Sequence, residues 1–399
     1  MIRRDEIKMS NEGNPVTNEE TKEPVRKLAS IQVISSLKPI EGADRIVCAT
    51  ILGWECVVKK DEGHKVGDLI IFIEPDSILP EKPEFEFLRE RKFRVKTIKL
   101  RKQISQGLVM PLSILPSDHR INLEEGVDVT EILQIRKHDS QLKEENDLVQ
   151  SQKNRSPILR FFMNFSIFRY IYFKLFGKIK GNWPDEYVQK TDETRIQVCA
   201  RKLMEHYNEE WYIGEKLDGQ SFTAFTYLQK AWGLWRKSFG ICSRNLWLKS
   251  RGKNNYWKMA EKYALEQRLI DCKGNIVIQG EICGPGIQGN KYNLAERKLY
   301  VFNVFRDGIM FSLADMESFC NCSGLQTVPI LNRSFIPSRD IGEGKEVSEV
   351  VKHMVELSQG DSQLLKRKRE GIVVRLKSNP RISFKVINPY FLLEEDKND

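Results

Sequence analysis

The chain has 399 residues, of which 40% are hydrophobic and 30% are charged, a composition that fits a globular protein with two or three domains. Its 64 Lys and Arg residues outnumber 55 Asp and Glu residues, and the net charge of +9 favours polyanionic partners. This charge does not distinguish nucleic acid from an acidic membrane surface. The eight cysteines form no pair of CxxC motifs, which argues against a zinc site and indicates reduced intracellular thiols.

Two stretches bear on the cellular location. Residues 1–27 are polar, lack the apolar core of a signal peptide and are predicted to be a disordered tail. The most apolar stretch, residues 158–176, contains Arg160, Arg169 and Lys174, and a membrane-spanning helix would have to bury these charges. We therefore expect a packed or interfacial helix there, no membrane partner, and a soluble intracellular protein, with cytoplasm and nucleus undecided.

Residues 28–136 have the pattern of a small closed β-barrel. Short apolar or alternating segments are separated by turn residues, and five or so strands in about 100 residues favour an oligonucleotide-binding (OB) fold. The expected strands cover residues 28–37, 46–52, 55–58, 69–73 and 94–100. Basic residues are dense from Arg89 to Lys102, where they indicate either a solvated strand face or a surface that follows phosphates.

Residues 137–182 are predicted to be a linker and the apolar helix, and residues 183–399 a second domain. A helix is expected to begin near Lys190, with Thr191 or Asp192 as its cap. Further on, strands are expected at 222–228, 276–282, 298–305, 371–376 and 382–387, and helices at 256–269, 314–322 and 347–358. No GxGxxG or Walker loop occurs, which excludes those phosphate cradles.

The stretch from Trp211 to Ser221 contains the strongest chemical signal. A strand over residues 211–217 would place Lys216 and Asp218 on one face, with the turn-forming Gly219 just beyond. A divalent cation held by the carboxylate can favour the neutral amine and offset the charge of a phosphate under attack. The pattern therefore suits covalent nucleotidyl transfer, although a surface strand that carries Lys and Asp would look the same.

Further motifs follow Lys216 in a fixed order. Ser243-Arg244 comes after an expected strand, Glu281 precedes a glycine-rich turn, and Phe302 lies in an aromatic strand. Glu370 begins the sequence EGIVVR, and Lys385 lies in the last strand. In this order the motifs resemble those of the covalent nucleotidyltransferase superfamily of ATP-dependent ligases and mRNA capping enzymes. The sequence is most similar to RNA ligases with an N-terminal OB module, the Naegleria and Deinococcus type, over residues 28–390.

The resemblance implies an α+β fold in which an OB-fold barrel precedes a nucleotidyltransferase domain of antiparallel sheets with flanking helices. It implies that Lys216 accepts AMP from ATP, and that Asp218, Glu281 and Glu370 surround Mg²⁺ or Mn²⁺. The other implied roles are adenine stacking by Phe302, base contacts from the Glu215 backbone, ribose or phosphate contacts by Arg244, α-phosphate neutralisation by Lys385, and pyrophosphate orientation by Arg195 with Lys190.

Two positions depart from the family pattern. Ile387 stands where many relatives carry a second lysine, and Ser221 where phage-type RNA ligases often have Asn. The resemblance implies sealing of 3′-OH and 5′-phosphate RNA ends, in a nicked or splinted duplex, by a monomer with a possible end-healing kinase or phosphatase. The alternatives are an mRNA guanylyltransferase, a DNA ligase or a noncatalytic RNA-binding OB protein. The first two usually carry an OB domain after the last motif, where this chain has only fourteen residues after Lys385.

Overall fold

The computed structural model describes residues 26–116, 121–138, 181–190, 192–231, 233–249, 251 and 254–398. Residues 1–25 of the expected tail, residues 139–156 of the expected linker, the apolar helix at 158–176 and the cap Thr191 lie outside the described residues. The expected domain boundaries at 27/28, 136/137 and 182/183 stay predictions. Among the helices that the structure describes, none is long and apolar enough to cross a membrane.

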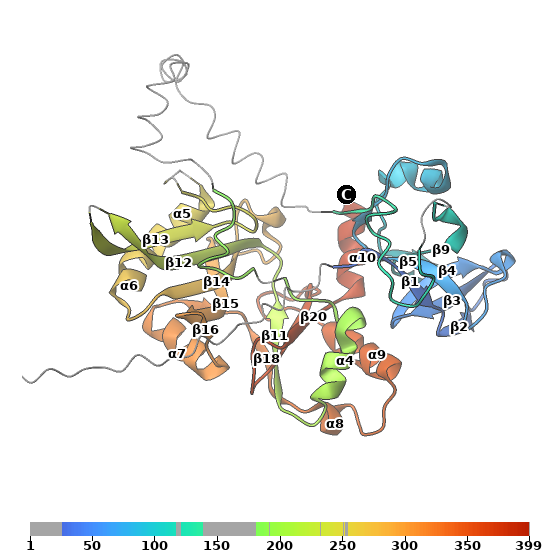
Figure 1. Ribbon diagram of the computed structural model, residues 1–399. Coiled ribbons are helices and arrows are strands. Elements are labelled where there is room, and N and C mark those ends of the chain that lie inside the picture. The colour runs from blue at the N-terminus through green and yellow to red at the C-terminus, as the bar shows by residue number, and fades with distance from the viewer. Residues whose placement is uncertain are drawn as a thin grey trace, which may run out of the picture.

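The N-terminal region consists of short antiparallel strands (Figure 1). They form two three-stranded sheets, β1-β5-β9 and β2-β3-β4, with the pairs β7-β8 and β10-β6 beside them. The strands are β1 (Ala29–Val33), β2 (Ser36–Pro39), β3 (Ile46–Ile51), β4 (Trp54–Lys59), β5 (Leu69–Ile73), β6 (Ser77–Ile78), β7 (Ile98–Leu100), β8 (Gln103–Ser105), β9 (Leu108–Met110) and β10 (Arg136–Lys137). Short 3₁₀ helices cover η1 (Lys60–Glu62), η2 (Pro83–Arg91) and η3 (Leu112–Ile114).

The structure explains why the sequence of strand β5 is a continuous apolar run. Ile71 and Ile73 pack into one core cluster, whereas Ile70 and Phe72 pack into the other, so both faces of the strand are buried. The strand expected at 94–100 is confirmed only for its last three residues, β7. Its basic stretch continues through the β7-β8 turn, where Arg101 and Lys102 both take positive φ, as a tight hairpin requires.

The C-terminal region contains two mainly antiparallel sheets. The order of the smaller is β18-β11-β19-β20 and that of the larger is β13-β12-β14-β15-β16, with β17 paired to β15. Their strands are β11 (Trp211–Lys216), β12 (Gln220–Ala231), β13 (Leu234–Cys242), β14 (Ile276–Cys283), β15 (Lys298–Arg306), β16 (Ile309–Met310), β17 (Gln326–Thr327), β18 (Ile330–Phe335), β19 (Gly371–Leu376) and β20 (Ser383–Ile387). The α+β class with an N-terminal barrel and antiparallel sheets is therefore confirmed.

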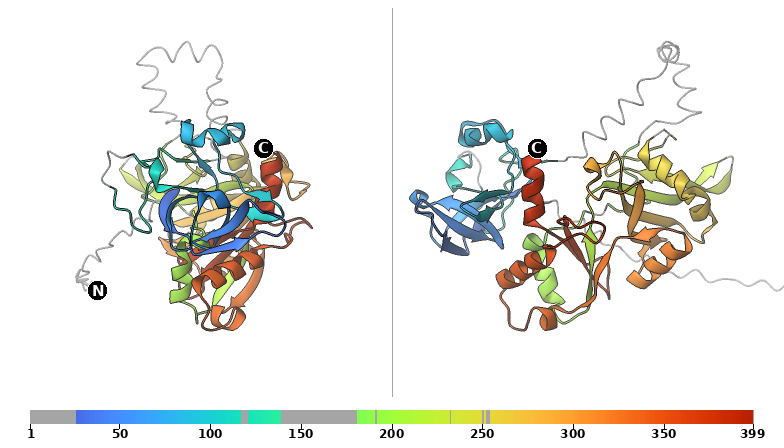
Figure 2. Two further views of the ribbon diagram at one scale, coloured as in Figure 1. Left: turned by 90° about the vertical axis from the view of Figure 1, so that its right-hand side faces the viewer. Right: turned by 180° about the vertical axis from the view of Figure 1, so that it is seen from behind.

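Helices cover one face of each sheet (Figures 1 and 2). Helices α4 and α9 share a core with the smaller sheet, and α5, α6 and α7 share one with the larger sheet. The helices and the 3₁₀ turn of this region are α4 (Ile196–Glu205), α5 (Asn255–Lys262), α6 (Leu265–Asp271), η4 (Gln288–Asn290), α7 (Leu313–Cys322), α8 (Pro337–Asp340), α9 (Val347–Ser358) and α10 (Pro389–Asn398).

Two expectations about helices are wrong. The helix expected near Lys190 begins only at Ile196, and its N-cap residue, Arg195, offers no side-chain cap, because the Asp192 carboxylate is engaged by cations instead. The helix expected at 256–269 is divided into α5 and α6 by Ala264, which has a positive φ of 48°. Helix α10 was not expected from the sequence.

The connection between the two sheets positions Lys216 and Asp218. Strand β11 of the smaller sheet leads through Leu217, Asp218 and Gly219 directly into β12 of the larger sheet. A Cβ atom at Gly219 would collide with the carbonyl oxygen of Ile282, so only glycine fits this crossing. Lys216 and Asp218 are therefore held where the two sheets meet.

Candidate active site

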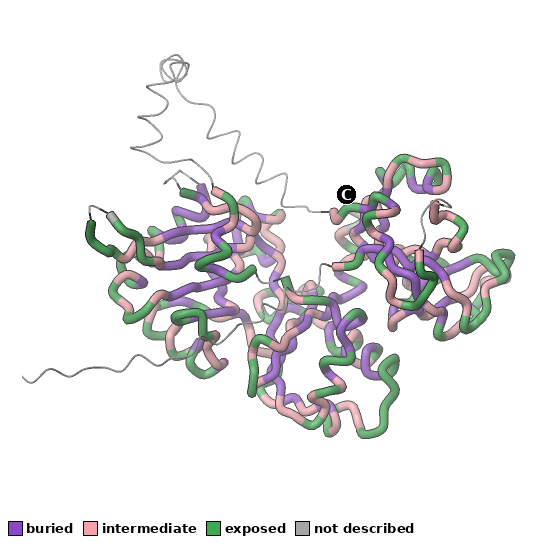
Figure 3. Tube along the Cα trace, in the orientation of Figure 1, coloured by how far each residue is buried: buried purple, intermediate pink, exposed green. Residues whose placement is uncertain are grey.

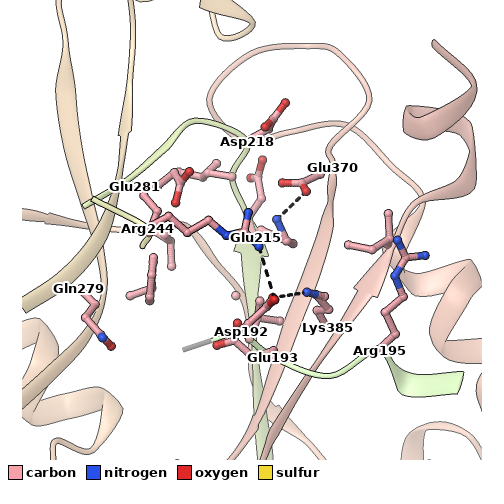
Figure 4. A pocket seen from close by; sticks show the side chains of 18 of the residues that line it. Asp192, Glu193, Arg195, Glu215, Asp218, Arg244, Gln279, Glu281, Glu370 and Lys385 are labelled. Atoms are coloured by element: carbon pink, nitrogen blue, oxygen red, sulfur yellow. Dashed lines mark hydrogen bonds and ion pairs between the residues drawn. The ribbon is translucent and has the colours of Figure 1, made fainter. Parts of the chain in front are cut away.

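A cavity of about 570 Å³ lies where the two sheets meet, and the N-terminal region contributes Asp76 and Arg94 to its wall. Figure 4 shows charged side chains from separate strands directed into it. All ten residues singled out in the sequence line this cavity, which shows that they are neighbours and leaves their roles as predictions. These residues are Lys190, Arg195, Glu215, Lys216, Asp218, Arg244, Glu281, Phe302, Glu370 and Lys385.

Lys216 lies among carboxylates. Its Nζ atom donates a hydrogen bond to Glu370 Oε1 at 2.5 Å (Figure 4). Burial acts to lower the pKa of Lys216, but the nearby carboxylates of Glu370, Glu281 and Asp218 outweigh this effect, and the net pKa is raised. In this state the amine is therefore an ammonium group, and it must lose a proton before it can act as a nucleophile.

Burial disfavours the charged forms of two of these carboxylates. Burial raises the pKa of Glu281 to about 8, and negative charge on Glu370 and Asp218 adds to the effect. Burial also raises the pKa of Glu370, whose Oε2 atom is buried and has no hydrogen-bond partner in the described part of the chain. A group of acids that resists ionisation, with an orphaned oxygen, is suited to a hard divalent cation.

Within the described residues, no three His, Cys, Asp or Glu side chains are grouped closely enough to form a ready metal site. Ammonium groups instead pair with two of the three expected carboxylates. Glu370 is paired with Lys216, and Asp218 is paired with Lys291. The donor chemistry of Asp218, Glu281 and Glu370 therefore fits a cation, while their present arrangement compensates the charge with lysines.

Lys291 and Glu395 are site residues that sequence reasoning missed. Lys291 follows η4, and its Nζ atom donates to Asp218 and, at 2.5 Å, to Glu395 of α10. The next residue, Tyr292, accepts a hydrogen bond at its hydroxyl from the Asp218 N–H at 2.7 Å. Neither position belongs to a motif, and the only sequence signal was the acidic character of the last residues.

The other end of the cavity reverses this charge arrangement. Asp192 accepts hydrogen bonds from Lys385 Nζ at 2.6 Å and from Lys137 Nζ at 2.7 Å, and Arg244 lies 3.4 Å away. Burial acts to raise the pKa of Asp192, but these three cations hold it far below its usual range. Burial lowers the pKa of Lys385 to about 8, although Asp192 opposes the effect. This end is suited to an anion that brings several negative charges.

Arg195 connects the cavity to the N-terminal region. One of its terminal nitrogens donates to Asp76 at 3.0 Å, and the guanidinium carbon lies 5.2 Å from the centre of the Trp54 ring. Its backbone pairs with that of Lys385, so the two cations lie side by side (Figure 4). The Nε and Nη1 atoms of Arg195 are buried without a partner among the described residues, which leaves two donors for a ligand.

The contacts of three further predicted site residues agree less directly with their expected roles. The Glu215 N–H, expected at the base edge, already donates to the Pro329 carbonyl at 2.8 Å, and the Glu215 carboxylate accepts from the Gln363 N–H at 2.9 Å. Phe302 lines the cavity while it packs against the cluster around Leu217. Lys190 lies at the cavity wall with Nζ 5.5 Å from the Trp183 ring centre.

The two departures from the family pattern also lie at the cavity wall. Ile387 presents an apolar side chain where relatives have a second lysine, so Lys385 is the one amine that this short strand brings to the cavity. Ser221 also lines the wall and offers a hydroxyl in place of an amide.

Comparisons with known proteins show which families and folds the chain is similar to. Residues 28–112 match a family described as an OB-fold domain, and residues 209–387 match a family described as RNA ligase. Among the curated proteins, none matches the chain.

Solved structures of Naegleria gruberi RNA ligase are similar over nearly the whole chain. An apo variant is 28% identical with a TM-score of 0.71, and the match covers 94% of this chain and 99% of that chain. The enzyme with PPi is 27% identical with a TM-score of 0.71, covering 94% and 100%. A variant with ATP and Mn is 27% identical with the same TM-score, covering 93% and 100%.

The family matches and the similarity of nearly the whole chain to a solved RNA ligase lead to one conclusion. The chain combines an OB-fold domain at residues 28–112 with an RNA ligase domain at residues 209–387, in the fold of a solved RNA ligase.

Proposed function

We propose that this protein is an ATP-dependent RNA ligase that joins 3′-OH and 5′-phosphate RNA ends through AMP bound covalently to Lys216. One observation carries the proposal: a lysine amine among three carboxylates faces a cavity whose opposite end is lined by Lys385, Arg244 and Arg195. The similar Naegleria gruberi ligase has been solved with ATP and Mn and with AMP and Mn, which supports these ligands for this chain.

In the first step the Lys216 amine attacks the α-phosphate of ATP. An N–P bond forms, the bond to the bridging oxygen breaks, and pyrophosphate leaves. Glu370 Oε1 already accepts a hydrogen from Nζ, and burial raises the pKa of Glu370. This carboxylate is therefore placed to hold the proton that the amine loses.

Asp218, Glu281 and Glu370 would hold a Mg²⁺ or Mn²⁺ ion, directly or through its water, and this ion would favour the neutral amine and offset phosphate charge. To take this role, Asp218 must exchange its contact with Lys291, whereas Glu370 has Oε2 for the ion and keeps Oε1 for the Lys216 amine. Lys291 would then remain paired with Glu395 of α10.

The remaining residues would position ATP. Lys385 neutralises the α-phosphate as charge develops on it, and Arg244 contacts ribose or phosphate. Arg195, with two unpaired donors, and Lys190 orient the departing pyrophosphate. Phe302 stacks on adenine next to the Glu215 segment.

Two further transfers complete the reaction. The 5′-phosphate of RNA attacks the AMP phosphorus, the N–P bond to Lys216 breaks, and a pyrophosphate-linked RNA end forms. The 3′-hydroxyl of the other end then attacks the 5′-phosphorus and releases AMP, which leaves a phosphodiester bond. We propose a nicked or splinted duplex as substrate, a monomeric enzyme and an end-healing kinase or phosphatase as its partner.

A sealing assay tests the proposal. The protein is incubated with ATP, Mg²⁺ and splinted strands whose 3′-OH side is either RNA or DNA. We expect labelled AMP on the protein and joined product, with RNA preferred at the 3′-OH side. Protein labelling from GTP in place of ATP would indicate a capping enzyme, equal sealing of DNA a DNA ligase, and RNA binding without any labelling a noncatalytic protein.

A further inference from the structure

The segment that forms β12 and β13 has an unusual charge pattern. No Asp or Glu occurs from Gly219 to Ala260, although the whole chain has 55 of them in 399 residues. The same stretch carries eight basic residues: Lys230, Arg236, Lys237, Arg244, Lys249, Arg251, Lys253 and Lys258. A segment with positive charge and no compensating acid of its own is suited to contact a polyanion.

The strand pairing turns this segment into a projecting ribbon. Strand β12 pairs with β14 only from Gln220 to Phe225, whereas it pairs with β13 as far as Ala231. The distal half therefore extends past the sheet as two strands alone, as the views in Figures 1 and 2 agree. We call residues 226–231 and 234–239 the β12-β13 ribbon.

The ribbon begins at the active-site cavity. Ser221 and Thr223 near the start of β12, and Arg244 just after β13, line the cavity wall. Eight residues separate Thr223 from Ala231, which at about 3.3 Å per residue is roughly 25 Å of strand. A nucleic acid held at the cavity could therefore extend along the ribbon for several nucleotides.

The residues at the ribbon's end are exposed (Figure 3), and several of them are large and apolar. The exposed fractions are 68% for Trp235, 62% for Leu234 and 51% for Leu228. Lys230 lies directly opposite Trp235 across the strands, so these two side chains share one face of the ribbon, whereas Arg236 and Gln229 lie on the other face. Among the described residues, neither Lys230 nor Arg236 forms an ion pair, so both charges are available to a partner.

Exposed aromatic and basic side chains together favour nucleic acid over protein as the partner of the ribbon. Bases stack on exposed aromatic rings while adjacent basic side chains contact the phosphates, and surfaces of this kind bind strands without sequence preference. The cores of protein interfaces are instead depleted in lysine. Lys237 fixes the ribbon against the domain, because its Nζ atom donates to the carbonyls of Leu269 at 3.0 Å and Cys272 at 2.7 Å at the end of α6.

We propose that the β12-β13 ribbon binds the RNA substrate beyond the ligation site, with a phosphate at Lys230 and a base or strand end against Trp235 on the same face. This inference rests on the proposed function for the identity of the ligand. It adds a binding surface distinct from the residues that handle ATP.

The test compares Trp235→Ala and Lys230→Gln with matched controls in the full chain. Ile309→Ala removes another exposed side chain, with an exposed fraction of 73%, and Lys202→Gln removes one exposed charge on α4. The probe is a fluorescent nicked RNA duplex, for which Kd is measured by anisotropy and KM by sealing. Label transfer from ATP to the protein is measured without RNA.

We expect Trp235→Ala to raise Kd and KM for RNA about tenfold, as the loss of one stacked base does. Lys230→Gln should reduce the slope of log Kd against log salt by about 0.9, the value for one lost phosphate contact. Label transfer from ATP should stay within about twofold of the unsubstituted protein in all variants, because ATP does not touch the ribbon.

RNA Kd, KM and salt slope equal to those of the controls would overturn the inference. So would a dimer, seen by sedimentation, that Trp235→Ala dissociates while RNA binding is unchanged, because the ribbon's end would then be a protein contact. If the unsubstituted protein neither accepts AMP nor seals RNA, the proposed function fails. A loss of RNA affinity confined to the ribbon variants would still support the ribbon as the RNA-binding surface in that case.

Discussion

The two ends of the cavity are opposites in charge. At one end Lys216 and Lys291 lie among Glu370, Glu281 and Asp218. At the other end Asp192 lies among Lys385, Lys137 and Arg244. In each case fewer residues of one sign compensate a larger group of the other sign.

The pKa shifts show what each end lacks. Burial raises the pKa of Glu281 to about 8 at the carboxylate end and lowers the pKa of Lys385 to about 8 at the cation end. Both shifts mean that the charged form is poorly solvated where it stands. A divalent cation would relieve the first and a phosphate the second, so the comparison explains why one nucleotide with its metal ion would fill both ends.

The largest effect is expected for the reacting group of the carboxylate end. Lys216→Ala and Lys216→Arg should each reduce protein labelling by ATP by at least about 10⁴-fold, because no neutral amine remains at this place. Sealing of RNA that already carries a 5′-linked AMP should persist, since the last step does not need a lysine nucleophile. Unchanged labelling of either variant would remove Lys216 from the chemistry, and thermal unfolding serves as the folding control.

The carboxylates of the same end should give the next largest effect. Glu281→Gln or Glu370→Gln keeps the shape but removes a ligand charge, and we expect labelling to fall about 100-fold, with more Mg²⁺ or Mn²⁺ needed for half-maximal rate. Glu317→Gln, at the ion pair with Arg333, is the matched control, because Glu317 does not line the cavity. An unaltered dependence on metal concentration would contradict the assignment.

Lys385 at the cation end should make the rate of protein labelling by ATP depend on pH. Lys385 is charged below its pKa of about 8, so the charge that it offers the α-phosphate is present at neutral pH and lost as pH rises through 8. The rate of labelling at low ATP should therefore fall by about tenfold per pH unit above that point. In Lys385→Arg this fall should disappear, because arginine stays protonated. A fall that persists in the arginine variant would assign it to another group.

The smallest effect is expected for the minority residue of the cation end. Asp192→Asn removes the anion that ATP phosphates must displace, and KM for ATP should decrease about threefold at about pH 6, where Lys385 stays charged. The same change withdraws the charge that raises the pKa of Lys385, so the high-pH decline should begin at lower pH. An increase in KM would show that Asp192 helps to bind ATP.

Much of the fold and the candidate site could be predicted from the sequence because strands and motifs are local signals. The strand at 69–73 and that at 371–376 were predicted to the residue, and the order of motifs brought all ten candidate residues to one cavity. Asp192 was mistaken for a helix cap because it has the right local chemistry, and only folding reveals the three cations that engage it.

Other features arise only in three dimensions. Lys291 reaches Asp218 from a turn, and Glu395 reaches Lys291 from the last helix, contacts between segments more than 70 residues apart. Arg195 is bound by Asp76 across a separation of 119 residues. The break at Ala264 also lacks a local signal, because alanine ordinarily favours a continuous helix.

Whether Lys216 carries the nucleotide is tested most directly by mass spectrometry of peptides from protein incubated with ATP and Mg²⁺. We predict AMP on the peptide that contains Lys216, attached through an acid-labile P–N bond and released as adenylylated RNA when 5′-phosphate RNA is added. AMP on a different residue, or sealing of RNA without any AMP-bearing peptide, would contradict the mechanism.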